Sequence, residues 1–255
     1  MARRRGRSPG AEVVDAVVSL NRASSEGVGV GENDVQAVGA SGRDGTAPFE
    51  LGGINHLALV CRDMGRTVDF YTNVLGMPLV KTIELPAGMG QHFFFDCGGG
   101  DCLAFFWFPE APEPVPGVSG PRGRPDQAEL TSAIGSMNHV AFTVPAERIE
   151  GYRDRLEAAG VACTEVANHD DSEWGLSKRM HPGVFVRSIY FQDPDGILLE
   201  FAAWTRALTP GDVRHEPARA ADPAEAWRGG RSASTASRSN HPDREQRITR
   251  RRSSR

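Results

Sequence analysis

The chain has 255 residues, with 29 basic and 33 acidic side chains and a formal net charge of −4. This length could hold one large domain or two small ones. No apolar run is long enough to cross a bilayer, and the short apolar stretch near the N-terminus is interrupted by Asp15, so we predict neither a signal peptide nor an anchor. We expect no membrane partner.

The charge is concentrated in the middle of the chain. Taking away the 17 basic and 12 acidic residues of 1–48 and 208–255 leaves a net charge of −9 for the centre. An acidic body does not suit a protein that reads the nucleic-acid backbone. The basic run "RITRRRSSR" is therefore interpreted as a solvated end, and no nucleic-acid partner is expected.

The four cysteines contain no C-x-x-C pair. In a chain of this length they are typical of free thiols in a reducing compartment. We therefore expect a cytoplasmic protein and no zinc site built from sulfur.

The composition divides the chain into three parts. Residues 1–48 and 208–255 show no sustained apolar period and are predicted to be disordered. Residues 49–207 form the predicted domain. Its halves are separated by a linker at 109–134, which begins with the Pro- and Gly-rich stretch "PEAPEPVPGVSGPRGRPDQ".

In chain order, the first half (49–108) begins with a strand and continues with a helix, because "DMGRTVDFYTNVLGM" has apolar residues at helical spacing. Three further strands follow. The predicted strands are 54–60, 79–84, 91–96 and 102–108, with the helix over 63–77.

The second half (135–207) repeats this order. A strand over "MNHVAFTV" precedes a helix over 146–160 that ends at Gly160. Strands are then predicted near 162–167, 186–192 and 197–203, the last two joined by the turn "DPDG". The unit β-α-β-β-β is thus written twice, which indicates an internal duplication.

Both halves begin with the same short pattern, "GGINHLALVC" at 52–61 and "GSMNHVAFTV" at 135–144. Each copy supplies one histidine, His56 or His139, with an alanine two residues later on the same strand face. Glu200 lies in the last predicted strand, "GILLEFAAW", where an unpaired carboxylate would be costly to bury.

Two neutral imidazoles and one carboxylate form a set that suits a divalent metal. We therefore predict that His56, His139 and Glu200 hold iron(II), with manganese or zinc as alternatives. The competing interpretation is that each histidine is an ordinary strand residue with a structural role.

The segments "INHLALV", "FYTNVLGM", "MNHVAF" and "YFQDPDGILLEF" resemble the vicinal-oxygen-chelate superfamily of glyoxalases, bleomycin-resistance proteins and extradiol dioxygenases. The resemblance covers nearly all of 49–207. It implies an α+β fold in which two βαβββ modules form a cupped, eight-stranded mixed sheet around one metal site.

The ligand pattern is closest to that of extradiol ring-cleavage dioxygenases. Ala104 or Phe105 stands where a carboxylate from the first module would be, so a four-ligand site of the glyoxalase I type is not supported. The resemblance also implies catalytic roles for Tyr190 and His181, which precede Glu200 as a tyrosine and a histidine do in those enzymes.

The chain departs from the dioxygenase pattern at the acid–base histidine, where it has Asp101. His92 is nearby, but aligning "FFFD" with "YFQD" pairs it with Ile189, on the opposite face from Tyr190. Whether either residue replaces the missing histidine stays open. The polar segment 168–177 could form a rim over the site or an ordinary solvated loop.

We expect a metal-dependent enzyme that cleaves a catechol-like aromatic diol with O₂. The first alternative keeps the metal as a Lewis acid in a glyoxalase-like lyase or isomerase, or in a fosfomycin-type transferase. The second is a non-catalytic protein that binds an aromatic drug. A small aromatic or diol substrate and a possible homodimer complete these expectations.

Overall fold

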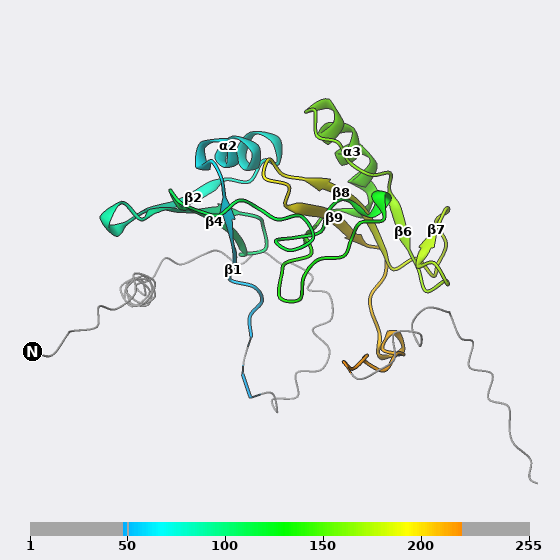
Figure 1. Ribbon diagram of the computed structural model, residues 1–255. Helices are drawn as coiled ribbons and strands as arrows, with labels where there is room; N and C mark the ends of the chain where they lie inside the picture. Colours follow the sequence, from blue (N-terminus) through cyan, green and yellow to red (C-terminus); the bar gives the residue numbers. More distant parts are fainter. Residues whose placement is uncertain (1–47, 50, 221–255) are drawn as a thin grey trace, which may run out of the picture. The chain divides into compact units, whose positions relative to one another are not determined.

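A computed structural model describes residues 48–49 and 51–220 (Figure 1). The chain forms two units, 1–49 and 50–255, and the described helices and strands all lie in the second. The disorder predicted for both ends of the chain falls mainly outside the described residues. The described stretch 208–220 contains a short 3₁₀ helix at Pro210–Asp212.

The first module forms a four-stranded sheet in the order β1-β4-β3-β2. The first strand pairs in parallel with the last, and the other neighbours are antiparallel. The strands are β1 (His56–Cys61), β2 (Leu79–Leu85), β3 (Gly90–Asp96) and β4 (Cys102–Trp107). Between β1 and β2 the chain forms α2 (Met64–Asp69), which continues as a π-helical turn at Phe70–Val74. A 3₁₀ turn at Pro86–Gly88 joins β2 to β3.

The second module repeats this topology in a five-stranded sheet, ordered β5-β9-β8-β6-β7. Again the first strand of the module pairs in parallel with the last. The strands are β5 (Val140–Thr143), β6 (Ala167–His169), β7 (Leu176–Ser177), β8 (Val186–Gln192) and β9 (Leu198–Trp204). A 3₁₀ turn at Ala146–Arg148 leads into α3 (Ile149–Ala158), and another, at Pro125–Gln127, lies between the modules.

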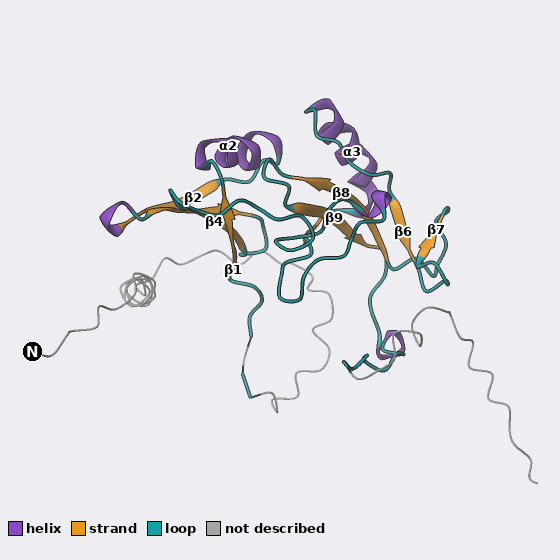
Figure 2. Cartoon of the chain, in the orientation of Figure 1, coloured by secondary structure: helices purple, strands orange, loops and turns teal. Residues whose placement is uncertain are grey.

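The α+β class and the two βαβββ modules are confirmed, as Figure 2 shows. The strands hydrogen-bond only within their own module, so the described residues form two sheets, not one continuous eight-stranded sheet. The strand predicted near 162–167 is wrong for most of its length. Only the bridge between Cys163 and Phe191 forms there, and regular pairing with β8 begins at Ala167.

The helix-side faces of both modules form one hydrophobic core. Strand alternation directs Leu103 and Phe105 of β4, and Leu199 of β9, into this core, where all three are at most 1% exposed. The modules are also joined by a buried hydrogen bond, since the Tyr71 hydroxyl donates to Asp193 over 3.2 Å. Both helices are therefore used to bury the sheets, and the opposite sheet faces are left for other roles.

None of the described helices is long and apolar enough to cross a membrane.

Candidate metal centre

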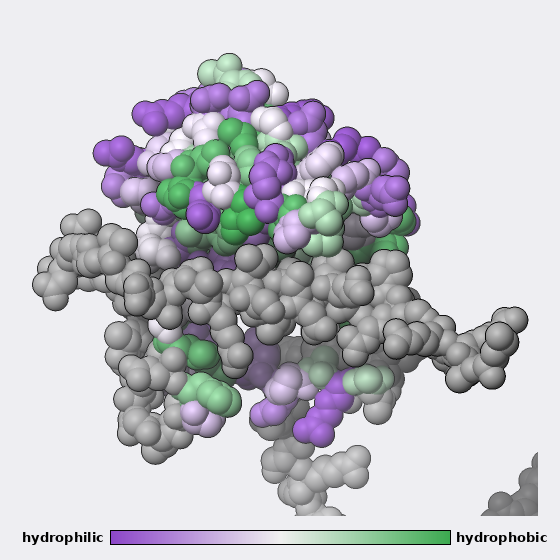
Figure 3. Space-filling model, turned by 90° about the vertical axis from the view of Figure 1, so that its left-hand side faces the viewer, coloured by the Kyte–Doolittle hydropathy of each residue, from purple (hydrophilic) through white to green (hydrophobic). Residues whose placement is uncertain are grey.

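The sheet faces that point away from the core carry the residues singled out in the sequence. On β1, the exposed side chains of His56, Ala58 and Val60 alternate with inward-facing neighbours. Val60 is 50% exposed, which is unusual for a valine in a parallel strand pair. Seen from the left-hand side of Figure 1, where β2 lies, the molecule shows apolar residues gathered in the middle of the surface and bordered by hydrophilic ones (Figure 3).

His139 and Glu200 meet on the outer face of the second sheet. His139 comes immediately before β5, and Glu200 lies in the middle of β9, opposite Ala141. The Nε2 atom of His139 is 2.9 Å from Oε2 of Glu200. The carboxylate is 5% exposed, and the small side chain of Ala141 leaves room beside it. The structure therefore brings together two of the three predicted ligands.

The asparagine before each histidine orients its ring. Asn55 Oδ1 lies 2.8 Å from Nδ1 of His56, and Asn138 Oδ1 lies 2.8 Å from Nδ1 of His139. An amide oxygen can only accept, so Nδ1 carries the proton and donates in both rings. Nε2 is then the atom left to bind a metal. The repeated Asn-His pair in the sequence was the signal for this role, although the asparagines were not assigned it from the sequence.

The amide of Asn138 is itself held in place. Its Nδ2 donates to the carbonyl oxygen of Leu130 over 2.7 Å. This contact fixes which end of the amide faces His139. The loop before β5 thus sets the orientation of a candidate ligand.

Glu200 is kept ionised by its neighbours. Burial alone raises the pKa of this carboxyl, but hydrogen bonds from His139 and Ser188 outweigh it, and the net effect lowers the pKa. The hydroxyl of Ser188, which is fully buried on β8, donates to Oε1 of Glu200. The carboxylate therefore presents Oε2 towards His139 as a charged ligand atom.

The two contacts of His139 show how a metal would fit. A neutral imidazole has one N–H, yet Nδ1 faces an amide oxygen and Nε2 faces a carboxylate oxygen. Two hydrogen bonds would require the charged imidazolium. A divalent cation between Nε2 and the carboxylate needs only the neutral ring, and this nitrogen–oxygen pair suits manganese, iron or zinc.

His56 lies on the sheet of the other module. Its ring is 5.4 Å from that of Phe94 and 6.5 Å from that of His92, measured between centroids. Among the described residues, no three His, Cys, Asp or Glu side chains are grouped so that they could hold a metal ion. Within one chain, His56 is therefore not brought to His139 and Glu200.

Tyr190 lies beside the candidate ligands, and its predicted catalytic role stays a prediction. It is paired with Glu200 across β8 and β9, and its ring centroid is 5.7 Å from that of His139. Burial, followed by the charge of Glu200, raises the pKa of Tyr190 to about 12, so its hydroxyl keeps its proton. This hydroxyl is 3.4 Å from Nε2 of His169, a β6 residue that was not singled out from the sequence. Burial lowers the pKa of His169, which favours the neutral ring.

His181 is placed in the polar loop before β8. Its Nε2 is 3.0 Å from Oδ2 of Asp170, and its Nδ1 accepts from the backbone of Gly183 over 3.1 Å. Both ring nitrogens are thus used within the loop. The predicted catalytic role of this residue stays a prediction.

The alignment that placed His92 on the sheet face opposite to that of Tyr190 is wrong. His92 lies opposite Phe106, which in turn lies opposite Val60, so it shares the outer face with His56. Its ring stacks on Phe106 at a centroid distance of 3.6 Å. Burial lowers the pKa of His92. Asp101 instead belongs to the turn before β4, where its carbonyl oxygen accepts from Cys97.

A model of the Glyoxalase/Bleomycin resistance protein/Dioxygenase superfamily matches residues 53–201, which is more than half of the chain. The chain belongs to this superfamily. Its enzymes are mostly metal-dependent, with manganese, iron or zinc as the ion, and act on small molecules. The predicted family and fold are confirmed.

The relatives differ in activity. The chain is 29% identical over 167 residues to glutathione transferase FosA of Serratia marcescens, covering 66% of this chain and 92% of that one. It is 30% identical over 117 residues to MhqE of Bacillus subtilis, named as a ring-cleaving dioxygenase, covering 44% of this chain and 33% of that one. The crystal structure of SMU.1112c is 26% identical, with a TM-score of 0.45, and covers 60% of this chain and 99% of that one.

Proposed function

We propose that this protein is a metal-dependent enzyme whose active site is shared by two copies of the chain. His139 and Glu200 of one copy would hold a divalent ion together with His56 of the second copy. The observation that carries the proposal is the 2.9 Å contact between His139 and the buried Glu200 carboxylate, backed by Ser188. His139 and Glu200 are arranged as two ligands on one sheet, and His56 of the same chain does not reach them.

The exposed face of β1 supports the second copy. His56, Ala58 and Val60 form an outward-facing row with a partly apolar surface. The His56 imidazole, oriented by Asn55, belongs to no group of three potential metal ligands among the described residues. A symmetric pair of chains would cover this row in both copies, because a two-fold interface uses the same patches twice. It would also make two equivalent metal sites.

The bound ion would supply Lewis-acid chemistry, polarising two neighbouring oxygens of a small substrate. The chain's own residues define the rest of the site. Asn138 keeps His139 in the tautomer that binds through Nε2, and Ser188 holds Glu200 charged. Tyr190 offers a protonated hydroxyl beside the ligands, which suits hydrogen bonding to a substrate oxygen.

Our first candidate is a Lewis-acid reaction without net oxidation, carried out by a transferase or lyase. The likeness to glutathione transferase FosA supports this choice because it extends over 92% of that protein, whereas the likeness to MhqE covers 33% of that one.

The second candidate is the ring-cleaving dioxygenase. It is favoured by His92, which shares the outer face with His56 and sits among Phe94 and Phe106, an aromatic setting that suits a catechol-like substrate.

Mixed pairs of two defective chains test the shared site. His56→Ala and His139→Ala chains carrying different tags are co-expressed, and the mixed dimer is isolated through both tags. A shared site predicts one metal per mixed dimer by mass spectrometry, with none in either variant alone and two in the wild-type dimer. No metal in the mixed dimer, with a full complement in wild type, would refute the shared site.

The reaction class is tested on the metal-loaded wild type. Turnover of thiol and epoxide or hemithioacetal substrates without oxygen, retained when manganese or zinc replaces iron, supports the Lewis-acid proposal. Iron-dependent oxygen uptake with a panel of catechols, in the absence of such turnover, would replace it by the dioxygenase.

A further inference from the structure

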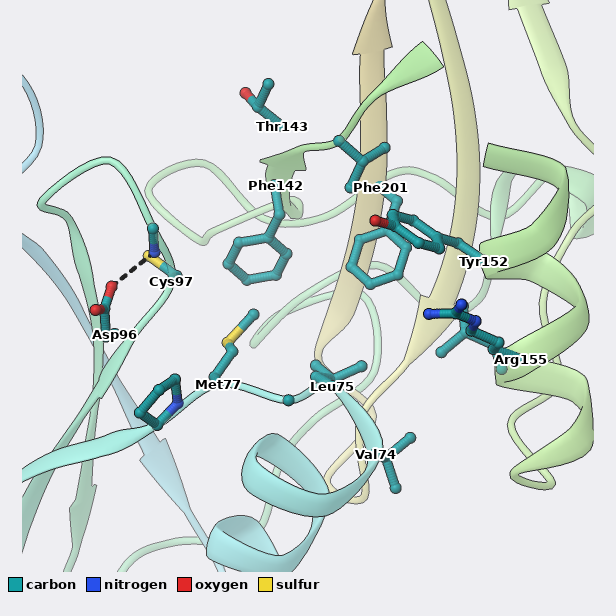
Figure 4. Close-up of a pocket in the computed structure, with 15 residues that line it drawn as sticks. Val74, Leu75, Met77, Asp96, Cys97, Phe142, Thr143, Tyr152, Arg155 and Phe201 are labelled. Atoms are coloured by element: carbon teal, nitrogen blue, oxygen red, sulfur yellow. Dashed lines mark hydrogen bonds between the residues drawn. The ribbon is translucent and has the colours of Figure 1, made fainter. Parts of the chain in front are cut away.

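A cavity of about 450 Å³ lies on the core side of the sheets, between the two modules (Figure 4). The end of the π-helical turn and the segment before β2 form one wall, and β5, β9 and α3 form the other. Leu75 and Met77 face Phe142, Phe201 and Tyr152 across it. Neither module could make this cavity alone.

The walls suit an aromatic ring. Phe142 and Phe201 are arranged edge to face, with centroids 6.5 Å apart and an interplanar angle of 69°. Tyr152 and Phe201 show the same arrangement at 5.9 Å and 66°. Rings set at these angles present both edges and faces to an additional ring, and Met77 adds a polarisable thioether.

One end of the cavity carries a positive charge, while Asp96, which accepts from the backbone of Gly98 over 2.8 Å, lines the opposite end (Figure 4). Arg155, one turn after Tyr152 on α3, lines the cavity, and its guanidinium carbon is 5.7 Å from the Tyr152 ring centroid. The neighbouring Arg153 is paired with Glu157 at 3.2 Å and Glu165 at 2.6 Å. Among the ion pairs of residues 51–220, none involves Arg155, so its guanidinium is available to an anion from outside the chain.

The cavity lies directly behind the candidate metal centre. In the β5–β9 pair, Ala141 is opposite Glu200 and Phe142 is opposite Phe201. Because successive strand residues point to opposite faces, the first pair lies on the metal side and the second lines the cavity. A molecule that packs against the two phenylalanines therefore contacts the strand that positions Glu200.

We propose that this cavity is a second small-molecule site, which binds an aromatic carboxylate. The ring packs against Met77, Phe142 and Phe201, and the carboxylate pairs with Arg155. The ligand is distinct from any molecule bound at the metal, because the two sites are on opposite faces of the same sheet.

Binding of 3-phenylpropionate to the metal-loaded, full-length protein tests the site. A ligand of this size in such a cavity is expected to have a Kd on the order of 1 mM, measured by ligand-observed NMR titration. The amide, 3-phenylpropionamide, keeps the ring and loses the charge. It is expected to bind about fivefold more weakly, and Arg155→Gln is expected to weaken the carboxylate by a similar factor.

Three variants separate this site from others. Arg66→Gln removes an exposed arginine from α2 and should leave binding unchanged. Leu75→Trp fills the cavity and should abolish binding, while far-ultraviolet circular dichroism confirms that the variant folds. His139→Ala removes a metal ligand and should leave binding intact.

Several results would overturn the proposal. These are no saturable binding to the wild type, equal binding of acid and amide, or unchanged binding in Arg155→Gln. Loss of binding in His139→Ala would place the probe at the metal instead.

Discussion

Replacing Asp193 by asparagine should stabilise the protein against unfolding, relative to the wild type, by more at neutral pH than at acidic pH. Asp193 begins the "DPDG" turn, is 6% exposed and accepts hydrogen bonds from the backbone of Asp195 at 2.9 Å and of Ile197 at 2.8 Å. Burial is the main reason that its pKa rises from 3.8 to about 6. Asparagine keeps an acceptor oxygen for the backbone and carries no charge.

The sign follows from proton linkage. A carboxyl whose pKa is raised by folding binds its proton more tightly in the folded state, so its stabilising contribution is complete below the unfolded pKa of 3.8. That contribution is lost as the pH rises through about 6. A shift of this size corresponds to about 3 kcal/mol. The Asp193→Asn protein avoids this loss.

Urea denaturation followed by tryptophan fluorescence, from about pH 4 to about pH 8, measures the effect. We expect the unfolding free energy of Asp193→Asn minus that of wild type to grow by about 2.5 kcal/mol across this range, because part of the contribution is already lost at about pH 4. A difference that is flat with pH would refute the reasoning, whatever its absolute size. Tyr71→Phe provides a second check. It removes a hydrogen bond that lowers the Asp193 pKa, so the wild-type loss of stability should move to higher pH.

Three further substitutions test the site and the backbone. Asn138→Ala should weaken metal binding about 10- to 100-fold in a chelator competition, because the His139 ring loses its orientation; unchanged affinity would contradict this. Ser188→Ala should lower the unfolding free energy of the metal-free protein by about 2 kcal/mol in urea, since a buried carboxylate loses a donor, and stability equal to wild type would count against it. Gly90→Ala should cost about 3 kcal/mol in thermal unfolding. Its φ is +135° and a Cβ would lie 1.9 Å from the Trp107 carbonyl oxygen. A melting temperature equal to that of wild type would contradict this close approach.

Local patterns were sufficient to predict most of the elements. The strand 186–192 has the predicted bounds, and the helix over 63–77 exists, although it changes to π-helical hydrogen bonding at Phe70. Periodicity shows which face of a helix is apolar, but not which backbone carbonyl accepts each hydrogen bond. The change to π-helical hydrogen bonding could therefore not be predicted. The grouping of strands into two sheets was also invisible, because it depends on which sheet edges meet and not on the composition of any strand.

The sequence allowed candidate site residues to be named one by one, but not their arrangement in space. A buried glutamate and a repeated histidine indicated His139 and Glu200, and the structure brings them into contact. His56 fits the same pattern, yet its distance from the others depends on how the modules pack. His169 was missed because the sequence placed it in the polar segment 168–177, which carries no periodic signal, whereas in the structure it ends β6 beside the Tyr190 hydroxyl.

The pairing of the first strand of each module with its last also shapes how the protein is made. Because β1 pairs with β4, the first sheet can be completed during synthesis only after Trp107 has emerged from the ribosome. The part of its core-facing side that α2 does not cover then stays exposed until the second module supplies residues such as Phe191 and Leu199. A nascent chain stalled between the modules would therefore hold a finished sheet whose apolar surface is only partly covered, the kind of intermediate on which chaperones act.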